Sequence, residues 1–236
     1  MEYQKINTLF KRDANNIIIP SQYTVPEFEY LKDNKFECTE KIDGTNIRIE
    51  LTSSDTGINM SFKGRTDKAD IPQHLLLKLN QLFDRGLLME IFGLIDDTPD
   101  CSITLYGEGY GVKIQKGGNY IKNDVDFILF DVKIGNWWLD RKSCEQIAEA
   151  LNIKIMPLIG YMTIPEAVEY VKKGFKSIIA ENKDYDAEGL ILKTPYGLRF
   201  RNGERIILKI KTVDFVKFKN KYGDEENPDQ PVNPYY

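Results

Sequence analysis

Residues 41–51 read Lys-Ile-Asp-Gly-Thr-Asn-Ile-Arg-Ile-Glu-Leu, a lysine-containing turn that runs directly into an alternating segment. Residues 47, 49 and 51 are Ile, Ile and Leu, and they alternate with polar residues. This pattern predicts a half-buried strand with polar residues on its other face. The turn-like residues 53–57 and the apolar residues after them predict a partner strand. The segment therefore predicts that Lys41 lies in a turn that leads directly into a strand.

The same periodicities predict strands interspersed with surface helices along the rest of the chain. Further strands are expected at residues 103–106, 126–132, 189–193 and 205–211. Helices are expected at residues 72–83, 143–151 and 163–173. A capping box at Ser143 would open the second helix and one at Thr163 the third. This order of elements predicts an α+β fold with mostly antiparallel sheets.

No internal repeat and no linker rich in Pro, Gly or Ser divides the chain. We therefore expect one domain over residues 1–221, followed by an acidic, proline-containing tail over residues 222–236. The tail holds four acidic residues and no Lys or Arg, so it accounts for the whole net charge of −4. Residues 205–221 hold six basic residues and one acid, so the composition is compatible with a polyanionic partner.

The histidine and cysteine counts exclude several classes of enzyme. The single histidine, His74, excludes HExxH metalloproteases and hydrolases that need two histidines. The three cysteines form no CxxC, which excludes a cysteine zinc site and a disulfide framework. They are expected to be reduced thiols in a cytoplasmic protein. The sequence shows no signal peptide and no apolar run of about 20 residues, so no membrane association is expected.

By itself Lys-x-Asp-Gly is weak evidence, because it arises by chance in about one chain in twenty of this length. Five further motifs follow it: Lys63-Gly64-Arg65, Leu105-Tyr106-Gly107-Glu108-Gly109, Asp126-Phe127-Ile128-Leu129-Phe130-Asp131, Ala187-Glu188-Gly189-Leu190-Ile191-Leu192-Lys193 and Ile207-Leu208-Lys209-Ile210-Lys211. In this order, over roughly residues 38–219, they resemble the motif set of the covalent nucleotidyltransferases. That group comprises DNA ligases, RNA ligases and mRNA capping enzymes.

The extended motif Lys-x-Asp-Gly-Thr-Asn is similar to that of RNA ligases of the RNA ligase 2 and RNA-editing type. DNA ligases and capping enzymes usually have Arg where this chain has Asn46. The resemblance implies a nucleotidyltransferase (ligase adenylation) domain with antiparallel sheets flanked by helices and no OB-fold. It also implies an ATP-dependent RNA ligase that uses Mg²⁺ or Mn²⁺. Its partner would be RNA, including nicks in RNA/DNA duplexes, whose 3′-OH and 5′-phosphate ends it joins.

The resemblance assigns the residues that carry the chemistry. Lys41 would attack the α-phosphate of ATP, release pyrophosphate and hold AMP as a phosphoramidate. Lys209 and Lys211 would offset the charge on the phosphates as pyrophosphate leaves. Glu188 would act at the metal, because carboxylate oxygens suit Mg²⁺. Glu108 would contact the ribose.

The remaining residues of the resemblance would contact the nucleotide. Glu40 would accept a hydrogen bond from the adenine amino group, and Phe127 would stack on the purine. Arg65 would reach the ribose or a phosphate, and Asn46 would hold a metal-bound water or a phosphate. Ile42 completes the nucleotide-binding set. For Phe127 the alternative is a core residue, since its segment reads as a buried strand; for each glutamate the alternative is an exposed surface acid.

Three other functions stay open at this point. Only 25 residues follow Lys211, too few for the C-terminal domain of most such enzymes, so the chain could be an adenylyltransferase that needs a partner subunit for sealing. A GTP-dependent capping guanylyltransferase is the second alternative, and Asn46 fits it poorly. The third is a nucleic-acid-binding module with a degenerate active site. The joint retention of five motif residues argues against it: Lys41, Glu108, Glu188, Lys209 and Lys211.

Overall fold

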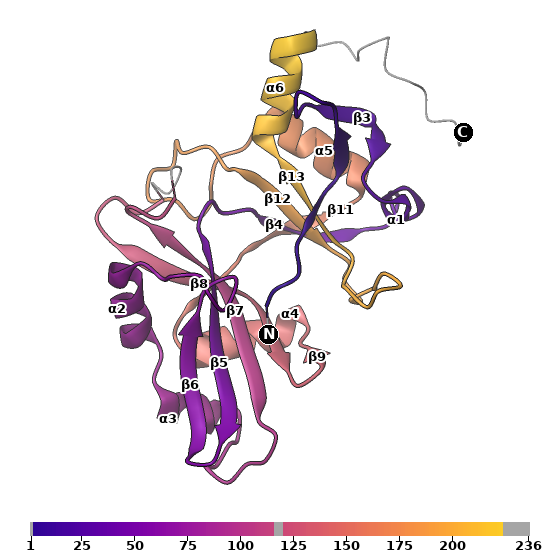
Figure 1. The fold of residues 1–236 in the computed structure, drawn as a ribbon. Helices are drawn as coiled ribbons and strands as arrows, with labels where there is room; N and C mark the ends of the chain where they lie inside the picture. Colours follow the sequence, from indigo (N-terminus) through magenta and orange to yellow (C-terminus); the bar gives the residue numbers. More distant parts are fainter. Residues whose placement is uncertain (1, 116–119, 224–236) are drawn as a thin grey trace. The chain divides into compact units, whose positions relative to one another are not determined.

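The computed structural model describes residues 2–115 and 120–223, and its contacts group the chain into two compact units (Figure 1). Unit 1 comprises residues 2–3, Ile42–Met156 and Ile179–Asn182, and unit 2 comprises Gln4–Lys41, Pro157–Ile178 and the chain from residue 183 onward. That these units form the one expected domain, residues 1–221, stays a prediction. Of the expected tail, residues 224–236 lie outside the described residues.

Unit 1 is built on a six-stranded sheet in the order β10-β8-β7-β5-β6, with β9 paired to β8. Its strands are β5 (Thr45–Ser54), β6 (Gly57–Lys63), β7 (Ser102–Gly111), β8 (Val125–Ile134), β9 (Trp137–Trp138) and β10 (Lys154–Ile155). Neighbouring strands are antiparallel except β8 and β10. The core combines apolar residues of the sheet with those of α2 (Gln73–Leu82), α3 (Arg85–Ile91) and α4 (Arg141–Ala150).

Strand β5 is buried on both faces, whereas its alternation predicts burial on one. Arg48 is fully buried and Glu50 is 4% exposed. A buried charge is costly unless it is paired, and here the Glu50 carboxylate lies 2.9 Å from both Arg48 Nη1 and Lys63 Nζ. These ion pairs explain how a charged strand face can be covered.

Unit 2 is built on a five-stranded sheet in the order β1-β13-β12-β4-β11. The strands are β1 (Asn7–Thr8), β4 (Phe36–Glu40), β11 (Leu158–Met162), β12 (Gly189–Lys193) and β13 (Ile207–Lys211). Only β1 and β13 are parallel among the pairs of this sheet in the described part of the chain. A hairpin of β2 (Phe10–Arg12) and β3 (Ile18–Tyr23) and the helices α1 (Pro26–Tyr30), α5 (Ile164–Lys173) and α6 (Thr212–Tyr222) complete the unit.

The predicted α+β class with mostly antiparallel sheets is confirmed. Helix α5 begins with the expected capping box of Thr163 and Glu166 and ends at Gly174. Helix α4 begins earlier than predicted, because Asp140 rather than Ser143 is the N-cap and accepts from the Ser143 backbone N–H at 2.7 Å. Aspartate caps a helix about as well as serine does, so Asp140 caps the helix three residues before the predicted start.

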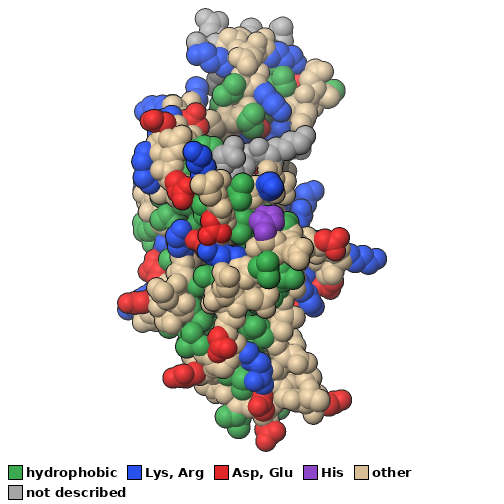
Figure 2. All heavy atoms as spheres, turned by 90° about the vertical axis from the view of Figure 1, so that its left-hand side faces the viewer, with side chains coloured by type: hydrophobic (Ala, Val, Ile, Leu, Met, Phe, Trp, Pro, Cys, Tyr) green, Lys and Arg blue, Asp and Glu red, His purple; other side chains and the backbone are tan. Residues whose placement is uncertain are grey.

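The surface carries charges of both signs. On the face drawn in Figure 2, Lys and Arg side chains are interspersed with Asp and Glu, in keeping with the zero net charge of the sequence outside the tail. Within the described residues, no helix combines the length and the apolar character needed to cross a membrane.

The packing of β7 against β8 predicts a strong effect of adding one methyl group at Gly107. A Cβ atom there would lie 2.1 Å from Phe127 Cζ and 2.5 Å from the Ile128 carbonyl oxygen. Because Phe127 is fully buried, we expect Gly107→Ala to lower the free energy of unfolding by about 1–3 kcal/mol or more. Thermal unfolding measures this loss.

Gly160→Ala is the matched control, because its Cβ would meet no atom closer than Met162 Cε at 4.0 Å. Its unfolding free energy should stay within about 0.5 kcal/mol of the parent. Equal melting temperatures for the two variants would contradict the packing described for Gly107.

Candidate active site

Lys41 lies directly after β4 in unit 2, beside the start of β12. Its backbone N–H donates to the Gly189 carbonyl at 2.8 Å, which continues the antiparallel pairing of β4 with β12. The Lys41 ammonium pairs with Oε2 of Glu188, and the Lys211 ammonium lies 2.8 Å from Oε1 of the same carboxylate. One carboxylate therefore bridges the ammonium groups of two lysines that lie 170 positions apart in the sequence.

The register of β12 with β13 produces this bridge. Gly189 is the direct partner of Lys211, so Glu188, one residue earlier, lies at the same edge of the sheet. Gly189 has φ 151°, and a Cβ atom there would lie 2.0 Å from the Ile210 carbonyl oxygen. Only glycine fits this approach, and the strand pair that holds Glu188 beside both lysines depends on it.

Lys209 and Lys211 share one face of β13, as the alternation predicted. Leu208 and Ile210 are buried in the unit 2 core, while the two lysines are half-buried. The face that carries Lys209 and Lys211 also carries the end of β4 at Lys41. Two ammonium groups bridged by one carboxylate leave an excess of positive charge, which attracts phosphate.

Glu40, the last residue of β4, is fully buried. Its Oε2 accepts from the Ile178 backbone N–H at 2.9 Å, and the Ser177 hydroxyl also donates to the carboxylate. Burial raises the pKa of Glu40 above its ordinary value, and the two hydrogen bonds oppose that shift. Its Oε1 is buried and accepts no hydrogen bond within the described residues. An unmatched buried acceptor of this kind suits a ligand that brings an N–H donor.

Asn46 and Glu108 are cross-strand neighbours in unit 1. They face each other directly in the β5–β7 pair, and the Asn46 Oδ1 atom is buried with no hydrogen bond from the described residues. Gly44 also lies against Glu108, since a Cβ atom on it would lie 2.7 Å from Glu108 Cγ and 2.5 Å from the Gly109 carbonyl oxygen. The glycine of the Lys-x-Asp-Gly motif is therefore required by packing against Glu108.

Ile42 and Asp43 begin unit 1, and Tyr120 holds their turn. Ile42 is 4% exposed. The Asp43 backbone N–H donates to the Tyr120 hydroxyl at 3.1 Å. Tyr120 is itself buried, with its ring edge-on to Tyr110. No sequence motif marks Tyr120, because the contact joins positions 77 residues apart through a backbone group.

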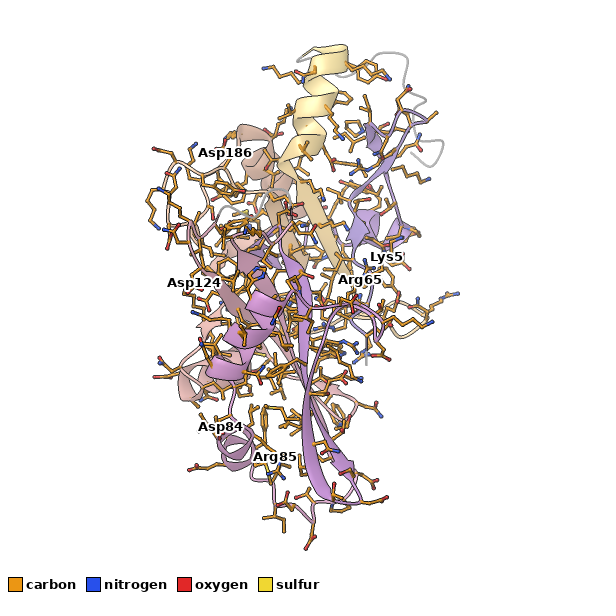
Figure 3. The ribbon with its side chains drawn as sticks, turned by 60° about the vertical axis from the view of Figure 1, so that its left-hand side comes forward. Lys5, Arg65, Asp84, Arg85, Asp124 and Asp186 are labelled. Carbon is orange, nitrogen blue, oxygen red and sulfur yellow. The ribbon has the colours of Figure 1, made fainter. Side chains whose placement is uncertain are left out.

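Arg65 is exposed in the loop after β6 (Figure 3). Buried Arg48 holds the loop on both sides of it. Arg48 Nε donates to the Gly64 carbonyl at 2.8 Å, and its Nη2 donates to Asp67 Oδ1 at 2.7 Å. No motif in the sequence indicates a role for Arg48. In the structure it fixes the backbone from which Arg65 projects, and a planar guanidinium with several donors suits that task.

Phe127 lies in the core of unit 1. It is fully buried, packs edge-on against Phe83 at 5.2 Å between ring centres and covers Gly107. Phe130, the other aromatic residue of this motif, is half-buried and lies edge-on to Tyr3. In the structure Phe127 is therefore a core residue, which was the alternative to base stacking, and neither face of its ring is open to a base.

The described residues contain no group of three or more His, Cys, Asp or Glu side chains that could enclose a metal ion. Glu188 is instead one carboxylate on the surface of unit 2, with a side chain 20% exposed. This suits Mg²⁺, which retains several waters and takes one or two carboxylates together with phosphate oxygens.

Comparison with known proteins adds a family and a fold. A family model described as RNA ligase matches residues 34–211. Three structures of a Naegleria gruberi RNA ligase are similar to this chain. The complex with pyrophosphate has a TM-score of 0.57 and 20% identity over 95% of this chain and 60% of that one. A mutant with ATP and manganese has a TM-score of 0.59 and 18% identity, over 92% of this chain and 64% of that one. An apo mutant has a TM-score of 0.58 and 18% identity, over 93% of this chain and 60% of that one. The likeness concerns the fold, and this chain spans a little over 60% of the ligase's length.

The environment of Glu40 predicts how this residue affects stability as pH changes. Because its pKa is raised in the folded protein, the unfolded chain releases this proton first. The free energy of unfolding should therefore fall as pH rises above about 4.5, through the raised pKa. Glu40→Gln lacks this loss, so the parent should lose stability relative to the variant over that range. Urea unfolding from pH 4 to pH 7.5 measures the difference.

Glu166→Gln is the control with the opposite sign. Lys35 and the Thr163 backbone hold the pKa of Glu166 below its ordinary value, so its contribution is lost as pH falls. The parent should gain stability relative to this variant as pH rises to about 4.5 and should gain none above it, so the unfolding series for this control starts at about pH 3. Stability curves of the parent and Glu40→Gln that run parallel at all pH values would contradict the burial of Glu40.

Proposed function

Since this chain belongs to the RNA ligase family, we propose that it is an ATP-dependent RNA ligase that joins 3′-OH and 5′-phosphate ends. AMP is first attached to Lys41, then transferred to the 5′-phosphate, and finally released when the 3′-OH attacks. The observation that carries this proposal is the Glu188 carboxylate bound by both Lys41 and Lys211. It gathers a nucleophile, a metal ligand and a phosphate-binding cation from three motifs.

The geometry of Lys41 suggests how the first step is prepared. In the ion pair with Glu188 its nitrogen is an ammonium group, and an ammonium has no lone pair with which to attack phosphorus. Attack requires Glu188 to release Lys41, and the proton of Lys41 to pass to solvent water, which reaches this side chain because it is 18% exposed. Glu188 would be the carboxylate that holds Mg²⁺ or Mn²⁺, and the ion would supply positive charge that neutralises the phosphates. Lys41 would then face the α-phosphate as a free amine.

Lys209 and Lys211 supply the positive charge that leaving pyrophosphate requires. Both are half-buried on the face of β13 that carries the Glu188 bridge, so their ammonium groups are oriented before the nucleotide arrives. Fixed cations stabilise developing negative charge without reorganisation. This supports the role that the resemblance gives them.

Glu40 supports adenine as the base. Its Oε1 is a buried acceptor without a hydrogen bond from the described residues. The adenine 6-amino group would donate one to it, whereas guanine presents a carbonyl oxygen at the same position. Asn46, Glu108 and Arg65 are proposed to contact the ribose, phosphates and metal-bound water, with Ile42 beside them. We leave Phe127 out of this set because of its burial.

The similar Naegleria gruberi ligase supports the choice of ligands. Its structures contain pyrophosphate, ATP with manganese, or AMP with manganese. These correspond to the product, the substrate with its metal and the transferred group of the proposed first step. RNA as the joined substrate rests on the family. A partner subunit becomes necessary only if this chain forms the lysyl-AMP adduct and cannot seal RNA.

The adduct itself gives the most direct test. Protein freed of bound AMP with pyrophosphate should become covalently labelled by α-labelled ATP with Mg²⁺, and Lys41→Ala should remove all label. The bond should be labile in acid and stable in alkali, as a phosphoramidate is. Lys35→Ala is the control, since Lys35 pairs with Glu166, and it should label normally. GTP and NAD are run in parallel; absence of label with every nucleotide would falsify the proposal.

Removal of the β13 lysines tests the phosphate site. Lys209→Ala and Lys211→Ala should each slow adenylylation by about 10²- to 10³-fold. Their melting temperatures should be unchanged, because neither side chain packs in the core. Rapid-quench labelling of Lys41 measures the rate, and Lys217→Ala, an exposed lysine of α6, serves as control. A folded double variant with near-normal labelling would remove both lysines from the mechanism.

A further inference from the structure

The loop between β12 and β13, residues 194–206, is an ordered extension of the unit 2 sheet (Figure 1). We call it the β12–β13 hairpin. Thr194 begins its turn and accepts from the backbone N–H groups of Gly197 and Leu198 at 3.0 and 2.9 Å. Farther along, Phe200 N–H donates to the Glu204 carbonyl at 2.8 Å. These bonds fix the backbone, so the side chains that it presents are held in place.

Tyr196 projects from this turn into solvent. It is 91% exposed, the largest exposed fraction of any large hydrophobic residue in the described part of the chain, and Leu198 beside it is 44% exposed. An aromatic side chain held on a rigid turn without burial provides an open ring face. Such faces serve as stacking platforms for bases.

Two arginines accompany Tyr196, and no carboxylate among the described residues neutralises them. Arg199 donates to the Gly203 carbonyl at 2.8 Å, and Arg201 is exposed. The one acid of the hairpin, Glu204, accepts instead from Asn202 at 3.0 Å. Several other surface cations of unit 2 do meet carboxylates, as Lys35 meets Glu166 and Lys176 meets Asp186. The hairpin therefore combines an open aromatic ring with unneutralised positive charge.

We propose that the β12–β13 hairpin binds a single-stranded segment of the RNA substrate. Tyr196 stacks on an unpaired base, and Arg199 and Arg201 bind the adjoining phosphates. RNA offers both the flat rings and the phosphate charge that these side chains match, whereas a protein partner would require a larger apolar surface than Tyr196 and Leu198 provide. This inference rests on the proposed RNA ligase activity.

The hairpin contacts RNA away from the joined ends. Gly189 lies beside Lys41 at one end of β12, and the hairpin begins after its other end at Lys193. A strand rises about 3.3 Å per residue, so Tyr196 lies about 20 Å along the sheet from the reacting lysine. The hairpin thus contributes to substrate affinity and leaves adenylylation of Lys41 unaffected.

Binding of a fluorescent single-stranded RNA of about 20 nucleotides to the full chain, measured by anisotropy, tests this. Tyr196→Ala should weaken binding about tenfold, and Tyr196→Phe, which keeps the ring, should restore it. The double variant Arg199→Ala with Arg201→Ala should weaken binding and reduce the magnitude of the slope of log affinity against log salt by about 1.4, because each phosphate contact to a single strand contributes about 0.7. Every variant should label normally with ATP at Lys41.

Two controls match these changes. Trp137→Ala removes an aromatic residue that is 79% exposed at the start of β9, where residues 134–137 include no Lys or Arg. Lys172→Ala removes an exposed cation that lies 4.0 Å from Glu169. Both should bind RNA as the parent does.

The outcomes separate the two proposals. A parent protein that forms no lysyl-AMP overturns the proposed function. A parent that labels and binds RNA, with hairpin variants that bind equally well, overturns the role of the hairpin alone. Equal losses from Tyr196→Ala and Trp137→Ala would also overturn it, because the effect would then belong to any exposed aromatic residue.

Discussion

The Glu188 carboxylate, held between the ammonium groups of Lys41 and Lys211, is the interaction on which the candidate site depends. It requires strand β12 to approach β13 so closely that only glycine fits at position 189. It also requires β4 to end opposite Gly189, where the Lys41 backbone pairs. Three motifs that are separate in the sequence are thus brought together by one register. The bridge keeps two like charges close in the absence of a nucleotide, since the carboxylate offsets their repulsion.

A second group of charges gives unit 1 its internal order. Arg48, Glu50, Lys63 and Asp67 pair with one another around the buried face of β5. Removal of one member would leave a partner buried without its counter-charge, which costs more than the pair contributes. The same guanidinium fixes the loop that carries Arg65. Stability of the strand and placement of a nucleotide-binding candidate therefore depend on one side chain.

The spacing of apolar residues in the sequence predicted the helices and strands that have one apolar and one polar face. The helix α5 and the strands around Lys41 and Lys211 were found because their burial follows a regular repeat. Helix α6 was missed, since it begins directly after β13 with no turn residue and no side-chain cap between them. The burial of Arg48 was missed because alternation indicates polarity, and only the three-dimensional pairing reveals neutralisation.

The motifs predicted which residues gather around Lys41 in unit 2 and did not predict what positions them. The residues that do this contact partners far away in the sequence. The Ser177 hydroxyl and the Ile178 backbone N–H donate to Glu40, and the Tyr120 hydroxyl accepts from the Asp43 backbone N–H. Such contacts leave no local pattern of residue types. Phe127 illustrates the converse, because an aromatic residue in a β motif has the same sequence signature whether it stacks on a ligand or fills a core.

The chain passes between the two units several times, and one of these passages comes directly after Lys41. The chain leaves unit 2 at Lys41 and enters unit 1 at Ile42, returns after Met156, and crosses again at Ile178. Each unit is therefore made from separate stretches of sequence, and neither corresponds to a fragment that a gene could gain or lose in one piece. The Glu40–Ile178 hydrogen bond ties two of these crossings together. Unit 2 in particular is assembled from stretches on both sides of the long segment Ile42–Met156, so its sheet forms only after the whole of that segment has been synthesised.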